Sequence, residues 1–167
     1  MRDVRIVAIL GFHKIGEPPP GGWDSWFYIP EPIFLEQLNY LRAHNWPVID
    51  LPTLLHGLDA PDSLRQRAAL LTFDDGYRSL LDGACRGLAQ FAFPAVVFVP
   101  TEFIGGTNRF DADEETEEPI CGWDDLRELE RRGISVQSHG VSHRALSQLS
   151  SSEQDEELMR SKAVLEQ

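Results

Sequence analysis

Short apolar runs alternate along this chain with segments of helical periodicity, and this alternation limits the folds that the chain can adopt. Five runs predict strands, at residues 4–12, 47–51, 68–73, 95–99 and 134–138. Runs that are apolar on both faces are typical of parallel sheets covered by helices, and repeated strand–helix units join parallel strands by crossovers. We therefore expect an α/β fold built on a parallel sheet or barrel, with its chemistry at the carboxyl ends of the strands.

Helices are predicted between these strands. Pro32 opens a helix with Phe34, Leu38 and Leu41 at helical spacing. A short helix is expected at 54–58, and longer ones at 77–91 and 123–132, the last ending at Gly133. Ser150 and Glu153 form a capping box for a helix that reaches residue 167.

Size and charge narrow the class of protein. The 167 residues suit a single domain over 1–167. A net charge of −12 argues against nucleic acid as a partner, because phosphates would be repelled. No apolar run is long enough to span a membrane, and the N-terminal apolar stretch is too short for a secretory signal. We expect a cytoplasmic protein, or an exported one whose signal is not part of this chain.

Two adjacent carboxylates follow the apolar run 68–73. Asp74 and Asp75 repel each other and would lose solvation at the end of a buried strand. A bound divalent cation would remove this penalty, and Gly76 allows the sharp turn that directs both side chains into a cleft. A solvated Asp-Asp-Gly turn is the alternative that this tripeptide leaves open.

Two histidines follow the last predicted strand. His139 and His143 are four residues apart, a spacing that lets both imidazoles reach one metal ion. Two surface histidines near a helix start are the competing interpretation. Together with one carboxylate, however, the pair supplies the three protein ligands of a catalytic zinc site.

The two motifs in this order resemble those of a known family. Thr72-Phe73-Asp74-Asp75-Gly76 resembles the first motif of the polysaccharide deacetylases with NodB homology, carbohydrate esterase family 4, and His139 to His143 resembles their second. The strand 95–99 and the segment from Trp123 lie between them as in the family. The resemblance implies a distorted (β/α) barrel and hydrolysis of N- or O-acetyl groups on a polysaccharide.

The resemblance also implies residue roles. Asp74 would be the general base, and Asp75, His139 and His143 would bind the metal, usually Zn²⁺, with Co²⁺ or Ni²⁺ as substitutes. Phe12-His13-Lys14-Ile15 resembles the N-terminal region of the poly-N-acetylglucosamine deacetylases, whose general acid is an N-terminal histidine. This makes His13 the candidate acid; a loop histidine without a catalytic role is the alternative.

Other candidates are less specific. Trp123 resembles an aromatic residue near the family's site and is a candidate for stacking on a sugar, although a core role fits equally. A loop with Trp23, Trp26, Phe27 and Tyr28 is a candidate lining for a glycan groove. The acidic run 111–118 fits a solvated loop better than a calcium site.

The chain departs from the family pattern in two ways. Gly140 stands where the family usually has Ser or Thr, so Ser138 or Ser142 would have to brace the metal loop. The family's third motif, which completes the oxyanion hole, does not occur. A closed barrel needs about seven or eight strands, so we expect an incomplete barrel that lacks its C-terminal part, has weak activity and tends to self-associate.

Two rival functions remain. Another metallohydrolase, such as a phosphoesterase, is disfavoured by the negative charge and by the lack of a basic phosphate clamp. A catalytically impaired glycan-binding fragment of the same fold is disfavoured by Asp74, because binding alone needs no base. Which acetylated glycan is the substrate stays open.

Overall fold

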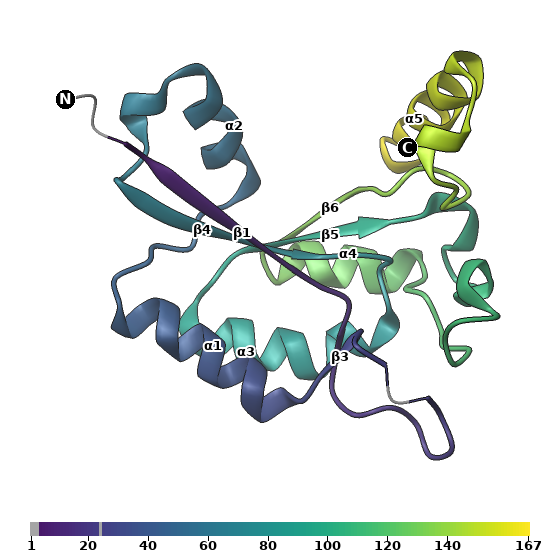
Figure 1. Ribbon diagram of the computed structural model, residues 1–167, viewed down its shortest axis with the longest axis horizontal. Coiled ribbons are helices and arrows are strands. Elements are labelled where there is room, and N and C mark those ends of the chain that lie inside the picture. Colours follow the sequence, from purple (N-terminus) through teal and green to yellow (C-terminus); the bar gives the residue numbers. More distant parts are fainter. Residues whose placement is uncertain (1–3, 24) are drawn as a thin grey trace.

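The computed structural model describes residues 4–23 and 25–167. Residues 1–3, which belong to the N-terminal segment considered above for a secretory signal, lie outside the described residues. Four strands form one parallel sheet in the order β1-β4-β5-β6 (Figure 1). Their bounds are Ile6–Phe12 for β1, Arg67–Phe73 for β4, Ala95–Val99 for β5 and Ile134–Ser138 for β6. The expected parallel α/β fold is confirmed.

Five α-helices accompany the sheet: α1 is Glu31–Ala43, α2 Leu51–Asp59, α3 Gly83–Phe91, α4 Trp123–Arg131 and α5 Ser151–Leu165. Helices α1, α3 and α4 lie along one face of the sheet (Figure 1). As predicted, α1 buries Phe34, Leu38 and Leu41, and each such side chain contributes about 1.5–3 kcal/mol to stability. Gly133 follows α4 with a φ of 83°, which explains why this helix ends there.

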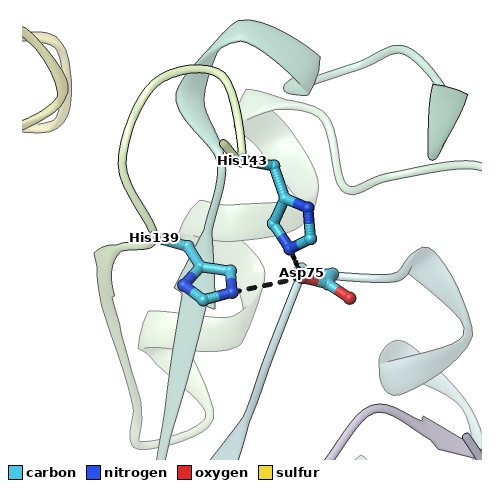
Figure 2. A group of neighbouring side chains, drawn as sticks. All are labelled: Asp75, His139 and His143. Carbon is cyan, nitrogen blue, oxygen red and sulfur yellow. Dashed lines mark ion pairs between the residues drawn. The ribbon is translucent and has the colours of Figure 1, made fainter. Parts of the chain in front are cut away.

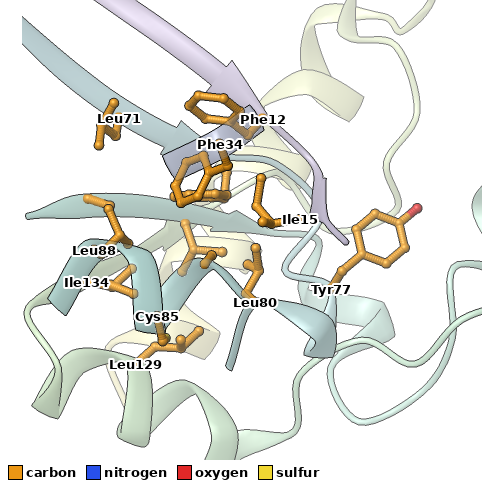
Figure 3. Close-up of a cluster of buried hydrophobic side chains, with 14 of the residues drawn as sticks. Phe12, Ile15, Phe34, Leu71, Tyr77, Leu80, Cys85, Leu88, Leu129 and Ile134 are labelled. Atoms are coloured by element: carbon orange, nitrogen blue, oxygen red, sulfur yellow. The ribbon is translucent and has the colours of Figure 1, made fainter. Parts of the chain in front are cut away.

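The core lies between the sheet and these helices. Figure 3 shows Phe12, Leu71 and Ile134 from the strands packed with Phe34 and Leu88 from the helices. The rings of Phe12, Phe34 and Phe73 contact one another, with centroid separations of 5.3, 5.4 and 6.0 Å. This core fixes the ends of β1 and β4, and so the residues that follow them.

Two predicted elements are wrong in detail. Residues 47–51 do not form a strand; Val48 makes one parallel bridge to Ala69. Helix α2 starts at Leu51 instead, because the Asp50 side chain accepts a hydrogen bond from the Thr53 N–H at 2.9 Å. The predicted helix 77–91 is divided into a 3₁₀ turn, Arg78–Leu81, and α3.

A second, small sheet was not predicted. Strands β2, Lys14–Ile15, and β3, Tyr28–Ile29, pair in parallel. They lie on either side of the Pro- and Gly-rich segment 16–22 in the sequence, and they bring Trp26 and Phe27, which precede β3, next to His13. This small sheet therefore places the N-terminal residues at the candidate site.

The sheet is open among the described residues, with β1 and β6 at its edges. Ile6 and Ile9 on β1 are 53% and 60% exposed, and an apolar hollow of about 870 Å³ runs between β1 and α1. An incomplete barrel agrees with these features, whereas self-association stays a prediction. None of the helices in the described part of the chain combines the length and apolar character needed to cross a membrane.

Strand register brings the predicted site residues to one edge. Phe12 pairs with Phe73, and Val99 pairs with Ser138. Two further hydrogen bonds extend the pairing beyond the strand ends, from Asp74 N to Phe12 O at 2.8 Å and from His139 N to Val99 O at 3.0 Å. The residues that follow β1, β4 and β6 therefore lie together at the carboxyl edge of the sheet.

Candidate metal centre and active site

The turn after β4 directs Asp75 inward. Asp75 and Gly76 both have a φ of 67°, the left-handed region that is costly for a residue with a side chain. A Cβ at Gly76 would lie 2.9 Å from Val99 Cγ2, so only glycine fits against β5. Asp75 is therefore only 1% exposed, and the strain at its backbone position indicates a functional constraint.

His139 and His143 approach Asp75 from a single loop. His139 directly follows β6, and His143 has a φ of 61°. Figure 2 shows both rings directed at Asp75: its Oδ1 lies 3.4 Å from His139 Nε2 and 3.1 Å from His143 Nε2. The structure thus brings together the three residues predicted to bind metal.

These three residues fit a divalent cation. One ligand atom from each lies within 4.8 Å of the other two. Asp75 Oδ1 is buried and makes no hydrogen bond of good geometry, although two imidazole nitrogens face it. Burial would raise the pKa of the Asp75 carboxyl, but the two imidazoles hold this pKa well below its usual range. An ionised, unsatisfied oxygen beside two nitrogens is the donor set of a catalytic zinc site.

His143 has further contacts on its other side. Its Nδ1 lies 4.0 Å from Asp111 Oδ1, and its ring centroid lies 4.2 Å from that of Phe110. Asp75 raises the pKa of His143 more than burial lowers it. A carboxylate near the second nitrogen orients a metal-binding imidazole. The position of Asp111 beside His143 was not predicted, because no local signal separates Asp111 from the neighbouring acidic residues.

The acidic run is not a solvated loop throughout, which corrects the prediction for residues 111–118. Glu115 is buried, and its Oε2 accepts a hydrogen bond from Lys14 Nζ at 2.9 Å. Lys14 is itself 1% exposed and lies 3.0 Å from Glu118 Oε1. This buried ion pair holds the loop that carries Asp111 against the strand that follows His13.

Removing the Lys14 charge is expected to destabilise the protein strongly. Lys14→Met leaves Glu115 buried without its partner, and breaking such a pair costs about 3–5 kcal/mol. Urea unfolding measures this, with Lys162→Met as the control, because Lys162 is exposed and pairs only at 3.7 Å with Glu166. Equal free energies of unfolding in both variants would contradict a structural role for this pair.

His13 lies on the opposite side of Asp75. Its Nε2 is 3.9 Å from Asp75 Oδ2, and its ring contacts Phe27 and Trp26 at centroid distances of 4.3 and 5.2 Å. Burial lowers the pKa of His13 against the opposing effects of Asp75 and Asp74. Asp74 is half-buried, and its charge raises the pKa of both His13 and His143. His13 therefore faces Asp75, whereas the catalytic roles of His13 and Asp74 stay predictions.

Trp123 does not line the candidate metal centre. It is the first residue of α4, is 42% exposed, and lines a separate hollow of about 520 Å³ with Val136 and Leu165. Trp26 is the more exposed indole, at 75%, and it contacts His13 directly. The structure therefore places an aromatic surface next to His13, whereas the role of Trp123 in sugar binding stays a prediction.

Comparisons with known proteins identify the family and the fold. The family model for polysaccharide deacetylase matches residues 62–167. YxkH of Bacillus subtilis (strain 168), which carries the same family name, is 29% identical over 160 residues, covering 96% of this chain and 51% of that protein. The chain thus spans about half the length of the curated relative that it matches.

Two solved structures share the fold. The Streptococcus pyogenes deacetylase PplD, in complex with acetate, matches with a TM-score of 0.77 and 21% identity, over 95% of this chain and 67% of PplD. IcaB from Ammonifex degensii matches with a TM-score of 0.78 and 23% identity, over 95% of this chain and 67% of IcaB. Because the family model also covers well over half of the residues, the chain belongs to the polysaccharide deacetylase family and has its NodB-type fold.

Proposed function

We propose that this protein removes acetyl groups from an acetylated polysaccharide in a reaction that depends on a divalent metal ion, most simply Zn²⁺, with Co²⁺ or Ni²⁺ as substitutes. Asp75, His139 and His143 would hold the ion. The observation that carries the proposal is the buried Asp75 carboxylate, with two imidazole nitrogens at one oxygen and His13 at the other.

The residues around the Asp75 carboxylate would each have a separate role in the reaction. A bound divalent ion supplies polarisation of the acetyl carbonyl and activation of water. Asp74 accepts the proton of the attacking water. His13 donates a proton to the sugar nitrogen as the bond between carbonyl carbon and nitrogen breaks, so that the products are acetate and a free amine.

Aromatic residues beside His13 support a carbohydrate substrate. Trp26, whose ring contacts that of His13, is 75% exposed, and an exposed indole next to a reactive centre suits the apolar face of a sugar ring. With the net charge of −12, this surface favours a neutral acetylated glycan over an anionic one.

Acetate release tests the function. The zinc-loaded protein is incubated with N-acetylglucosamine oligomers, and acetate is measured with an enzyme-coupled assay. Release that disappears when zinc is removed by a chelator and returns on adding zinc supports the proposal. Binding of the oligomers to the zinc-loaded protein without acetate release would instead identify a glycan-binding domain.

His13 is expected to act in the chemical step alone. His13→Ala should lower turnover by about 10²–10⁴-fold, because the leaving amine loses its proton donor, while zinc content stays unchanged. His56→Ala is the control, since His56 is an exposed histidine on α2. Wild-type turnover in His13→Ala would show that another group protonates the amine.

A further inference from the structure

The loop that carries both candidate histidine ligands is held from outside by α5. Glu157 on this helix is 6% exposed. Its Oε2 accepts hydrogen bonds from the backbone N–H groups of Val141 and Ser142, at 2.6 and 2.9 Å, and its Oε1 accepts one from Ser142 Oγ. One buried carboxylate thus fixes the two residues that precede His143.

Helix α5 makes polar contacts at this loop and at the end of β6. Its two buried residues are Glu157 and Ser161, and Ser161 Oγ lies 2.6 Å from Ser138 Oγ, immediately before His139. Leu158 and Met159 are 52% and 67% exposed. The middle of α5 therefore buries polar residues beside the metal loop and exposes apolar ones, while Leu165 near its C-terminal end packs against the core.

The lack of a side chain at Gly140 leaves room for the Glu157 carboxylate. It has a φ of 80°, and a Cβ at this position would lie 3.1 Å from Glu157 Oε2. Its N–H donates to Ser138 Oγ at 3.0 Å. Hydrogen bonds involving Ser138, Ser142 and Glu157 therefore brace the loop in place of the hydroxyl that the family usually has at position 140. The Glu157 carboxylate also occupies the space that a side chain at position 140 would need.

We propose that Glu157 is a positioning residue for the metal site: it pre-organises residues 139–143 so that both imidazoles face Asp75 before the ion arrives. This inference rests on the metal site of the proposed function. A carboxylate that accepts backbone N–H groups at both Val141 and Ser142 restricts the loop, and a restricted loop loses less conformational entropy on binding an ion. Groups that orient ligands in this way change metal affinity by about 10- to 100-fold.

The test compares four variants of the full chain. Glu157→Ala removes three hydrogen bonds, Glu157→Gln removes the charge but keeps the shape, and Ser142→Ala removes the hydroxyl bond only. Glu156→Gln is the matched control, because Glu156 is exposed on the same helix. Zinc affinity is measured by competition with a chelator, and the exchange of the Val141 and Ser142 amide protons is followed by NMR in the metal-free protein.

We expect zinc affinity to fall in the order control, Ser142→Ala, Glu157→Gln, Glu157→Ala, with the last weaker by about 10- to 100-fold. Amide exchange at both positions should accelerate in the Glu157 variants. If Glu157→Ala does not fold, the glutamine and Ser142 variants still establish the order. Unchanged exchange and unchanged zinc affinity in folded Glu157→Gln would overturn the inference.

Failure of the inference is distinguishable from failure of the proposed function. A wild-type protein that binds no zinc would refute the metal site, while the exchange data would still show whether Glu157 restricts the loop. If the wild-type protein and every Glu157 variant bind zinc with the same affinity, the metal site is supported, but Glu157 does not position it.

Discussion

Asp74→Asn is expected to reduce acetate release by about 10²–10⁴-fold while zinc remains bound. The amide cannot accept the proton of the attacking water, yet it has nearly the same size as the carboxylate. Asp74 is half-buried and is not among the three residues whose ligand atoms cluster. Zinc content and acetate release are measured on the same preparation.

Asp75→Asn is the matched comparison for this prediction. It should lose zinc, because Asp75 Oδ1 is the oxygen that faces both imidazoles, and its activity should fall as a consequence. Excess zinc should restore part of the activity of Asp75→Asn but none of that of Asp74→Asn. Loss of metal from Asp74→Asn with retention in Asp75→Asn would reverse the two roles.

Replacing both His139 and His143 with alanine is expected to reduce the metal content from about one ion per chain to a trace. Of the three protein ligands that a catalytic zinc ion requires, only the Asp75 carboxylate would remain. Elemental analysis after purification without chelators measures this, with His44→Ala plus His56→Ala as the control. Both control histidines are exposed. Equal metal contents in the two double variants would show that His139 and His143 do not bind the metal.

Much of the framework was predictable from local patterns. Four of the five predicted strands form the parallel sheet, because apolar runs bounded by turn residues specify buried strands regardless of their partners. The candidate site was predictable for a related reason. Asp75, His139 and His143 follow strand ends, and parallel strands bring such positions to one edge.

Other features depend on contacts between distant residues. Lys14 and Glu115 are 101 positions apart, so no local pattern could show that an apparently solvated acidic loop is anchored in the interior. The buried face of α5 could not be predicted for a different reason: the apolar side chains of Leu158 and Met159 are exposed, so apolar residues do not mark the face of this helix that is buried. Glu157 is buried because the metal loop packs against it, and the position of this loop is not encoded in the sequence of the helix.

The pairing of β1 with β4 has a consequence for the folding pathway. This contact joins Ile6 to Arg67, whereas β5 and β6 are joined by the shorter segment that carries α4. Closing a longer loop costs more chain entropy, and contacts between distant residues slow folding. We therefore expect the β5–α4–β6 unit to form early and β1 to dock late. His13 and Lys14 immediately follow β1, so the proposed acid would join the proposed metal ligands only when the last strand docks. An intermediate that lacks β1 would have both histidine ligands but no proton donor.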